Sequence, residues 1–252
     1  MKRLHIFVFL LFCQLTATNV GHASFENRVK VLYYEKIGEK YYRTREIRGN
    51  LDLAIRAYTS ALNIERSSAW RFHWKIARCY WMLGTREREK RKRLEYFALG
   101  VRFGERAVNG NADSSQSHLW YGMSLGSAAL ERGVMNALYQ KDRIRSELQK
   151  ALSLNPKEVN ALLGLAGWYY HVPQIFGGDR SESFRILKKA LSLDPNFTAT
   201  YLLKARLLIE SGQTGDARRA LLRLLKVERP TSTGSIEDRA TAKILLEQMN
   251  AG

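Results

Sequence analysis

The chain is poor in cysteine and proline. Its 252 residues include two cysteines and four prolines. Cys13 lies in an N-terminal apolar run, which leaves Cys79 without a partner for a disulfide or a paired metal motif. We interpret Cys79 as a small core residue. The scarcity of proline, together with little alternation of polar and apolar residues, favours helices over strands.

Motifs of catalysis are also missing. The sequence has no Gly-x-Ser-x-Gly, no recognisable Cys–His spacing and no Gly-Lys-Ser/Thr phosphate loop. His73, His118 and His171 each lack a second ligand at helical spacing, which argues against a zinc site. These absences predict a protein that is not an enzyme and that needs no metal or cofactor.

The first 23 residues have the three parts of a Sec-type signal peptide. Basic residues at positions 2 and 3 precede an apolar run from Ile6 to Cys13, and small residues occupy positions 21 and 23. The run is shorter than the ~20 residues that span a bilayer, and the bulky Phe12 argues against a lipid anchor at Cys13. We therefore predict a signal peptide over residues 1–23, cleaved after Ala23, and a periplasmic or secreted protein.

Acidic residues are outnumbered. The sequence has 24 Asp and Glu against 41 Lys and Arg, a formal net charge of +17. Such a balance is common in nucleic-acid-binding proteins, but the expected export argues against a nucleic acid. Outside the cytoplasm the same field favours an anionic membrane surface, polyanionic polymers, acidic proteins or small carboxylates. The simplest explanation of dispersed charge is a solvated surface.

A repeated pattern runs through the chain after residue 24. Two segments read Ala-Leu-Ser-Leu followed by Asn-Pro or Asp-Pro, at residues 151–156 and 190–195, and a degenerate copy starts at residue 61. They follow helix-like segments that carry a small residue, an aromatic residue and a glycine turn. This pattern resembles the tetratricopeptide repeat (TPR) family, whose unit is a helix–turn–helix of about 34 residues.

The resemblance implies an all-α fold, a TPR-like helix–turn–helix solenoid of about five irregular helix pairs with a C-terminal capping helix. We predict pairs that begin near residues 35, 70, 119, 159 and 198, in an array over residues 24–234. A lone amphipathic helix over residues 235–249 caps the last pair, and the capping helix and tail make up residues 235–252.

Glycine and alanine mark where these helices end and touch. Glycines are expected to end the first helices, where a left-handed conformation costs them little. Small residues in mid-helix are expected to let paired helices approach closely. The helix-ending glycines are Gly49, Gly84, Gly133 and Gly212, and the small residues are Ala77, Gly126, Ala166 and Ala205.

The array is irregular. The closing alanines fall at positions 61, 107, 151 and 190, so the units measure 46, 44 and 39 residues. We place the extra residues in three insertions: a charged run from Arg86 to Arg93 that extends a helix, a segment near residues 136–143, and residues 171–179. The charged run is most simply a solvated helix, and a contact with anionic lipid or an acidic partner is the alternative.

The third insertion carries a narrower resemblance. Its Phe-Gly-Gly-Asp turn at residues 176–179, preceded by Leu-Trp-Tyr-Gly at residues 119–122, is similar to exported bacterial TPR proteins related to the T component of TRAP transporters. That resemblance implies a periplasmic array that partners the solute-binding protein of a carboxylate uptake system. The turn also has a purely structural interpretation, in which Gly177 and Gly178 adopt special backbone angles and Asp179 caps the next helix.

First helices line the concave groove of a TPR array, so the repeat register predicts which side chains face a ligand. The second pair contributes alternating arginine and tryptophan at i, i+3, i+7 and i+10 from Arg71. These tryptophans can stack on an apolar body while the arginines fork onto a carboxylate. In the other interpretation the aromatics are core residues and the arginines snorkel outward. The groove candidates are Arg71, Trp74, Arg78, Trp81, Trp120, Met123, Asn160, Leu163, Tyr170 and Arg206.

Together these features predict an exported, non-enzymatic TPR protein. Its concave groove would bind a protein partner or an acidic small ligand, in association with a TRAP-type uptake system. The alternative is a charged cell-envelope adaptor that binds anionic lipid or polymer and loses binding steeply in salt. The apolar ends of the array also allow self-association. A cytoplasmic nucleic-acid-binding repeat would require that residues 1–23 are not a signal.

Overall fold

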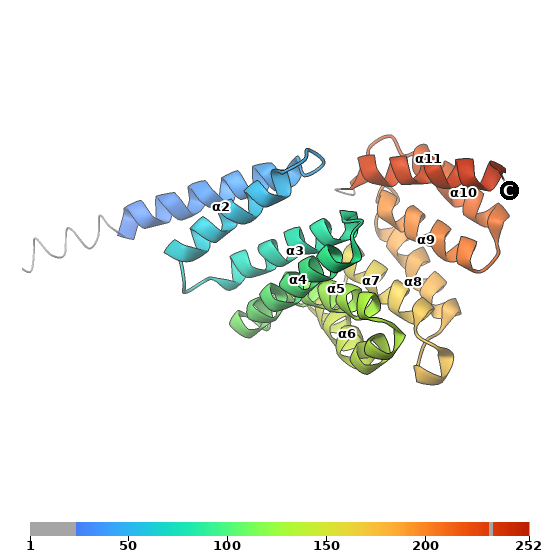
Figure 1. The fold of residues 1–252 in the computed structure, drawn as a ribbon, viewed down its shortest axis with the longest axis horizontal. Helices are drawn as coiled ribbons and strands as arrows, with labels where there is room; N and C mark the ends of the chain where they lie inside the picture. The colour runs from blue at the N-terminus through green and yellow to red at the C-terminus, as the bar shows by residue number, and fades with distance from the viewer. Residues whose placement is uncertain (1–23, 232–233, 252) are drawn as a thin grey trace, which may run out of the picture.

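The molecule is a curved stack of helices. The computed structural model describes residues 24–231 and 234–251, and within these ranges it contains helices and turns but no β-strand. The predicted signal peptide, residues 1–23, lies outside them. Figure 1 shows that the stack curves until its C-terminal helix comes round to the end of the second helix pair. Of the described helices, none is long and apolar enough to cross a lipid bilayer.

Ten of the helices form five consecutive antiparallel pairs, as predicted. The N-terminal helix (residues 24–43) pairs with α2 (Asn50–Ile64), α3 (Trp70–Arg86) with α4 (Lys90–Gly110), α5 (Ser115–Arg132) with α6 (Val134–Leu154), α7 (Val159–His171) with α8 (Arg180–Leu193), and α9 (Thr198–Glu210) with α10 (Thr214–Leu225). The last helix, α11 (Ser235–Ala251), packs on both α9 and α10 and is the expected cap.

The predicted starts agree with the structure for three pairs and differ for two. The pairs that begin with α3, α7 and α9 start where the sequence pattern places them, within a residue. The first pair is already helical at residue 24 rather than near 35, and α5 begins at Ser115 rather than near 119. Ser114 explains the earlier start of α5, because its side chain accepts a hydrogen bond from the backbone N–H of Ser117.

Small residues hold the paired helices close together. Ala77, Ala166 and Ala205 are completely buried, as predicted. Between successive pairs, a close backbone approach involves a glycine that the pattern did not single out: a Cβ on Gly104 of α4 would lie 2.7 Å from the Cα of Tyr121 in α5. Since neither atom belongs to a flexible side chain, this crossing requires glycine. Cys79 is also fully buried, as expected, and burial raises the pKa of its thiol to about 12.

Three of the four predicted helix-ending glycines have the expected backbone. Gly49, Gly133 and Gly212 lie at helix boundaries with φ angles of 87°, 112° and 75°. Gly84 was wrongly predicted, because α3 continues past it to Arg86. A Cβ at Gly84 would lie 2.4 Å from the ring of Phe97 in α4, so this glycine serves the packing of the two helices.

The charged run does not extend a helix as predicted. Helix α3 ends at Arg86 and α4 begins at Lys90. The Glu87 side chain accepts hydrogen bonds from the backbone N–H groups of Arg88 and Glu89, at 2.7 and 3.0 Å, and thereby stabilises a turn between the helices. A local side chain competes here with the helical hydrogen bonds.

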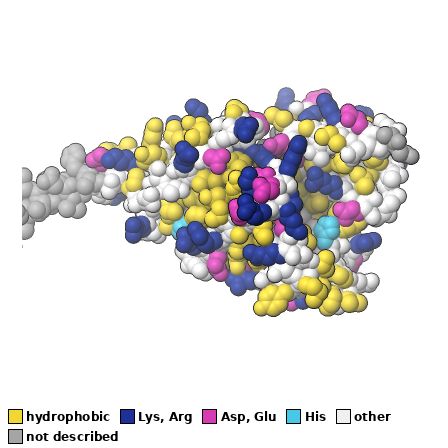
Figure 2. Space-filling view, viewed as in Figure 1, with side chains coloured by type: hydrophobic (Ala, Val, Ile, Leu, Met, Phe, Trp, Pro, Cys, Tyr) yellow, Lys and Arg dark blue, Asp and Glu magenta, His cyan; other side chains and the backbone are white. Residues whose placement is uncertain are grey.

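The other two insertions form a long helix and an ordered loop. Residues 136–143 lie in the first turns of α6, and residues 172–179 form the loop before α8, with a short 3-10 helix, η1 (Gln174–Phe176). Asp179 caps α8 by accepting from the N–H groups of Ser181 and Glu182. Both places expose apolar side chains, among them Met135, Tyr139 and Ile175 at 80, 84 and 85%. Figure 2 shows hydrophobic side chains gathered at the lower end of this face.

Candidate functional site

The first helices of the second, third and fourth pairs bring apolar side chains together. Trp74 and Trp81 of α3, Met123 of α5 and Leu163 of α7 are partly exposed and pack against the main core cluster. Trp120 of α5 is almost completely buried behind them, with its ring centroid 5.7 Å from that of Trp81. These five predicted residues belong to one core cluster or pack against it, and we call them the aromatic groove because first helices line the concave face of a TPR array. Trp120 is a core residue, whereas the other four side chains are partly exposed. The core interpretation therefore describes Trp120, and the ligand-facing interpretation describes the other four.

Polar contacts fix the groove side chains. The indole nitrogen of Trp81 donates to the hydroxyl of Ser127, 3.0 Å away in α5. The indole nitrogen of Trp120 donates to Gln116 at 3.0 Å, and Gln116 in turn donates to Glu158 at 2.7 Å. Asn160 donates to the same Glu158 at 3.1 Å. A hydrogen-bonded chain therefore links α5 to the beginning of α7 along one border of the groove.

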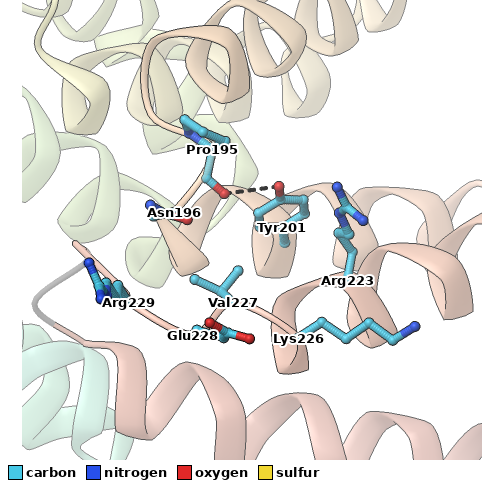
Figure 3. A pocket seen from close by; sticks show the side chains of 8 residues that line it. All are labelled: Pro195, Asn196, Tyr201, Arg223, Lys226, Val227, Glu228 and Arg229. Atoms are coloured by element: carbon cyan, nitrogen blue, oxygen red, sulfur yellow. Dashed lines mark hydrogen bonds between the residues drawn. The ribbon is translucent and has the colours of Figure 1, made fainter.

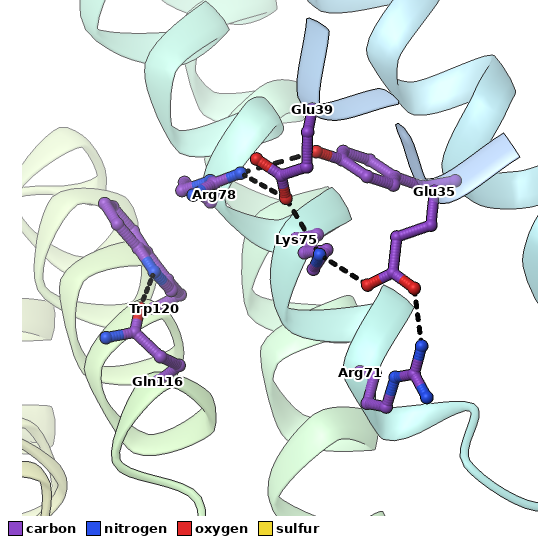
Figure 4. A network of polar contacts seen from close by, with 8 residues as sticks. Glu35, Glu39, Arg71, Lys75, Arg78, Gln116 and Trp120 are labelled. Carbon is purple, nitrogen blue, oxygen red and sulfur yellow. Dashed lines mark hydrogen bonds and ion pairs between the residues drawn. The ribbon is translucent and has the colours of Figure 1, made fainter. Parts of the chain in front are cut away.

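A cluster of charges borders the groove on the other side. The Arg71 guanidinium donates to Glu35 at 2.5 Å, and the Lys75 ammonium donates to both Glu35 and Glu39 at 2.8 Å. Arg78 lies 3.6 Å from the Glu39 carboxylate. Figure 4 shows these five side chains, which we call the α3 cluster, between the N-terminal helix and α3, with Trp120 and Gln116 on the neighbouring helix α5.

Arg78 is held by rings as well as by charge. Its guanidinium carbon lies 3.4 Å from the centroid of the Tyr42 ring and 5.1 Å from that of Trp74. Such stacking is favourable for a planar cation. The side chain is 13% exposed, and its Nε has no hydrogen-bond partner among the described atoms. Arg78 thus stabilises the junction of the first two pairs.

The two carboxylates pair with the arginines of α3 that were predicted to bind a ligand. Burial by itself would raise the pKa of Glu39, but Arg78 and Lys75 outweigh it and hold this pKa below its ordinary value. Glu39 is therefore ionised at neutral pH and pairs with Lys75 and Arg78. Arg78 was one of the residues predicted to bind a ligand. The sequence analysis missed both Glu35 and Glu39. Their i, i+4 spacing on the N-terminal helix was a signal for a pair of carboxylates on one face.

The remaining two candidates lie apart from this surface. Tyr170 is buried in the core, where its hydroxyl donates to the carbonyl oxygen of Leu207 at 2.8 Å. Arg206 is exposed on α9. The groove and the α3 cluster therefore contain eight of the ten predicted residues, counting Asn160 at the border.

A second hollow lies near the C-terminal end, and the sequence analysis did not anticipate it. It is an open pocket of about 400 Å³ between the α8–α9 turn, α9, the end of α10 and the following linker. Figure 3 shows Arg223, Lys226 and Arg229 around it, with the Tyr201 ring and Val227 between them. We call this the C-terminal pocket. Within the described part of the chain, none of its three cations forms an ion pair at 4 Å or less.

The aromatic groove and the C-terminal pocket lie in segments that match two different family models. A model of the family described as Regulator of microtubule dynamics protein 1-3 matches residues 34–176, more than half of the chain. The chain belongs to this family. A tetratricopeptide repeat model matches residues 178–232, which confirms the TPR interpretation for the C-terminal part. The family segment contains the aromatic groove and the α3 cluster, and the C-terminal pocket lies in the TPR segment.

Curated relatives in this family are mammalian and frog proteins. Regulator of microtubule dynamics protein 1 of Bos taurus is 28% identical over 149 residues, which cover 52% of this chain and 46% of the bovine protein. Regulator of microtubule dynamics protein 3 of Rattus norvegicus is 24% identical over 134 residues, 53% of this chain and 28% of the rat protein. The chain thus matches less than half the length of these two relatives.

Solved structures confirm the fold. A thermophilic TPR protein of Thermus thermophilus superposes with a TM-score of 0.65 at 16% identity, over 85% of this chain and 99% of that one. PilF of Pseudomonas aeruginosa superposes with a TM-score of 0.55, also at 16% identity, over 90% of this chain and 95% of that one. None of the matches described here is a TRAP transporter protein, so the predicted link to such a system stays a prediction.

Proposed function

We propose that this protein is a non-enzymatic scaffold that binds an extended segment of a partner protein in the aromatic groove. The observation that carries the proposal is the set of partly exposed apolar side chains on three successive first helices, Trp74, Trp81, Met123 and Leu163. Partly exposed aromatic residues with fixed rotamers are typical anchors of protein interfaces. The polar chain from Trp120 to Asn160 supplies a border with hydrogen-bonding groups, as interfaces require.

The charges beside the groove favour a segment that is mainly apolar with little charge of its own. The α3 cluster has three cations against two carboxylates, so most of its charge is already neutralised within the molecule. A ligand carboxylate would have to compete with Glu35 and Glu39 for the same donors. For this reason we favour a protein segment over the acidic small ligand that the sequence alone allowed.

A peptide selection tests this proposal. Random peptides displayed on phage are selected on the chain from residue 24 to 252, and the affinity of enriched peptides is measured by fluorescence anisotropy. Trp74→Ala and Met123→Ala should each weaken binding about tenfold, as expected for the loss of an interface anchor. Tyr139→Ala, which removes an aromatic side chain that is 84% exposed outside the groove, is the matched control. Equal losses for the groove and control variants would refute the groove assignment.

The net charge supports a second candidate. A chain of net charge +17 is attracted to any acidic polymer or membrane surface, and the names of the curated relatives connect them with microtubules. We propose such an adaptor role as the alternative. Co-sedimentation with microtubules and with vesicles of anionic lipid, at about 50 and about 300 mM salt, tests it. Binding that is retained at both salts, or no binding at all, would count against a charge-driven adaptor.

Export, a solute-binding-protein partner and self-association also remain proposals for this chain. Export and a microtubule partner exclude each other, since a cleaved signal peptide would remove the protein from the cytoplasm. Sequencing the N-terminus of protein made by the native host decides between them. A terminus at Ser24 favours export, and an intact Met1 favours the cytoplasmic alternative.

A further inference from the structure

The open C-terminal pocket is bounded on one side by a linker that is held by hydrogen bonds at both ends. At one end Thr231 donates from its hydroxyl to Asp194 at 2.6 Å and from its backbone N–H to Asn196 at 3.2 Å. At the other end Arg239 of α11 donates to the carbonyl oxygens of Leu225 and Val227. The linker therefore holds a defined position over the α8–α9 turn, and the pocket is part of the folded structure.

The walls of the pocket combine an apolar surface with cations. The Tyr201 hydroxyl donates to the carbonyl oxygen of Pro195 at 3.0 Å, which fixes the ring in the wall next to Val227. Arg223 and Lys226 come from the end of α10, and Arg229 comes from the linker. Glu228 is the one carboxylate in the lining. Three cations against one carboxylate leave an excess of two positive charges.

The neighbouring carboxylates form no ion pair with the three cations of the lining within the described residues. Asp194 accepts from Thr231, and Asp238 accepts from Thr198 at 2.6 Å. Glu237 pairs with Arg86 of α3 at 2.6 Å. The carbonyl end of α10 would also repel an anion, but Arg239 binds two carbonyl oxygens there and opposes that effect.

We propose that the C-terminal pocket binds a phosphate monoester carried on a small apolar body. An excess of two positive charges matches the dianion that such a group forms at neutral pH. All three cations are exposed, and Figure 3 draws Arg229 on one side of the Tyr201 ring and Arg223 with Lys226 on the other, so these flexible side chains would have to turn inward to act as forked and single donors to the phosphate oxygens. The pocket of about 400 Å³ has room for more than a bare phosphate, and the ring of Tyr201 beside Val227 provides a surface on which the body packs. This site is independent of the aromatic groove.

Titration calorimetry with phenyl phosphate tests the proposal. The chain from residue 24 to 252 should bind one equivalent saturably at neutral pH. Arg223→Ala and Arg229→Ala should each weaken binding about tenfold, the size expected for losing a charge-assisted hydrogen bond. Arg219→Ala is the matched control, because Arg219 lies on the same helix, pairs with Asp216 and is outside the pocket lining. Losses as large for Arg219→Ala as for Arg223→Ala would show non-specific attraction and overturn the site.

Two further measurements test the ligand class. Phosphate monoesters take up a proton with a pKa of about 6, so binding should weaken about tenfold between about pH 7.5 and pH 5. Benzoate, which keeps one negative charge over that range, should bind more weakly at neutral pH. Benzoate binding as tightly as phenyl phosphate would overturn the assignment to a phosphate.

The apolar wall has its own test. Tyr201→Ala should weaken phenyl phosphate more than inorganic phosphate, and circular dichroism checks that the variant folds. An equal effect on the two probes would remove the apolar body from the proposal. Trp74→Ala should leave phenyl phosphate binding unchanged, so failure of this site and failure of the groove proposal are distinguishable.

Discussion

The α3 cluster and the C-terminal pocket contain similar side chains in different surroundings. Each has three cations and at least one aromatic ring. In the α3 cluster each of the three cations lies within 4 Å of at least one of two carboxylates from the N-terminal helix. In the pocket the one lining carboxylate, Glu228, has no ion pair among the described residues. The cluster therefore holds two helix pairs together, whereas the pocket retains its positive charge for a ligand.

The difference teaches that a basic stripe has to be interpreted together with its distant neighbours. Arg71 meets a carboxylate 36 residues earlier in the chain, and Lys75 meets one 40 residues earlier. Both contacts depend on how the first pair packs against the second. A count of charges along one helix cannot separate a structural cluster from a binding site. Three predictions test the comparison, beginning with the largest expected effect.

Replacement of Lys75, the central cation of the α3 cluster, should give the largest difference in stability between the α3 cluster and the C-terminal pocket. Lys75→Met leaves Glu35 and Glu39 facing each other with one donor fewer, and the lysine side chain is 10% exposed. The free energy of unfolding should fall by about 2 kcal/mol, less than for a fully buried pair because both carboxylates are partly exposed. Urea unfolding followed by circular dichroism measures it.

The matched control for that experiment is Lys226→Met in the C-terminal pocket. Because Lys226 is exposed and has no described ion pair, the change in stability should stay within about 0.5 kcal/mol. Equal effects of the two lysine substitutions would contradict the distinction between a structural cluster and a free pocket.

Acid should weaken the α3 cluster through Glu39. The pKa of Glu39 is held below its ordinary value in the folded protein, so its contribution to stability is complete above about pH 4.3, the unfolded value. It is lost as the pH falls through the lower, folded pKa. Glu39→Gln should therefore destabilise the protein at neutral pH, and this deficit should shrink as the pH falls from about 4.3 to about pH 3. Urea unfolding at both values measures this, and a deficit that is unchanged in acid would contradict the ion-pair role.

The smallest effect on stability is expected for the ion pair between α3 and α11. Arg86 of α3 lies 2.6 Å from Glu237 of α11, and both side chains are partly exposed. A double-mutant cycle with Arg86→Met and Glu237→Gln should give a coupling energy of about 0.5 kcal/mol. Arg86 also donates to the carbonyl oxygen of Arg45 at 2.7 Å, so the single arginine variant should cost more than the coupling alone. Strict additivity would show that the contact joins the regions without stabilising them.

The fold was largely predictable because local patterns repeat. The alanines, the turn glycines and the Ala-Leu-x-Leu segments gave five pairs and a cap, and three pair starts lie where the sequence placed them. Gly84 misled because a glycine that permits close packing looks the same in sequence as a glycine that ends a helix. The charged run misled because Glu87 takes the backbone donors of its neighbours, a competition that periodicity does not reveal.

The candidate site was only partly predictable, since the role of each side chain depends on contacts with residues far away in the sequence. Helical register grouped Trp74, Trp81, Trp120 and Met123, and in the structure these residues lie in or against one core cluster. It could not show that Tyr170 reaches Leu207 or that Glu35 reaches Lys75. The C-terminal pocket depends on a linker lying across a turn that comes much earlier in the chain, and this arrangement has no repeat pattern.

The contact between Arg86 and Glu237 has a consequence for how this array can evolve. Open solenoids change length readily, because a repeat gained or lost in the middle moves the ends without breaking any contact between them. Here the second pair touches the capping helix, so the path from α3 to α11 must make a fixed turn. A deletion or duplication of one pair would swing α11 away from Arg86. A change in the number of repeats would thus lose this one contact, a small cost that an array with separated ends does not have.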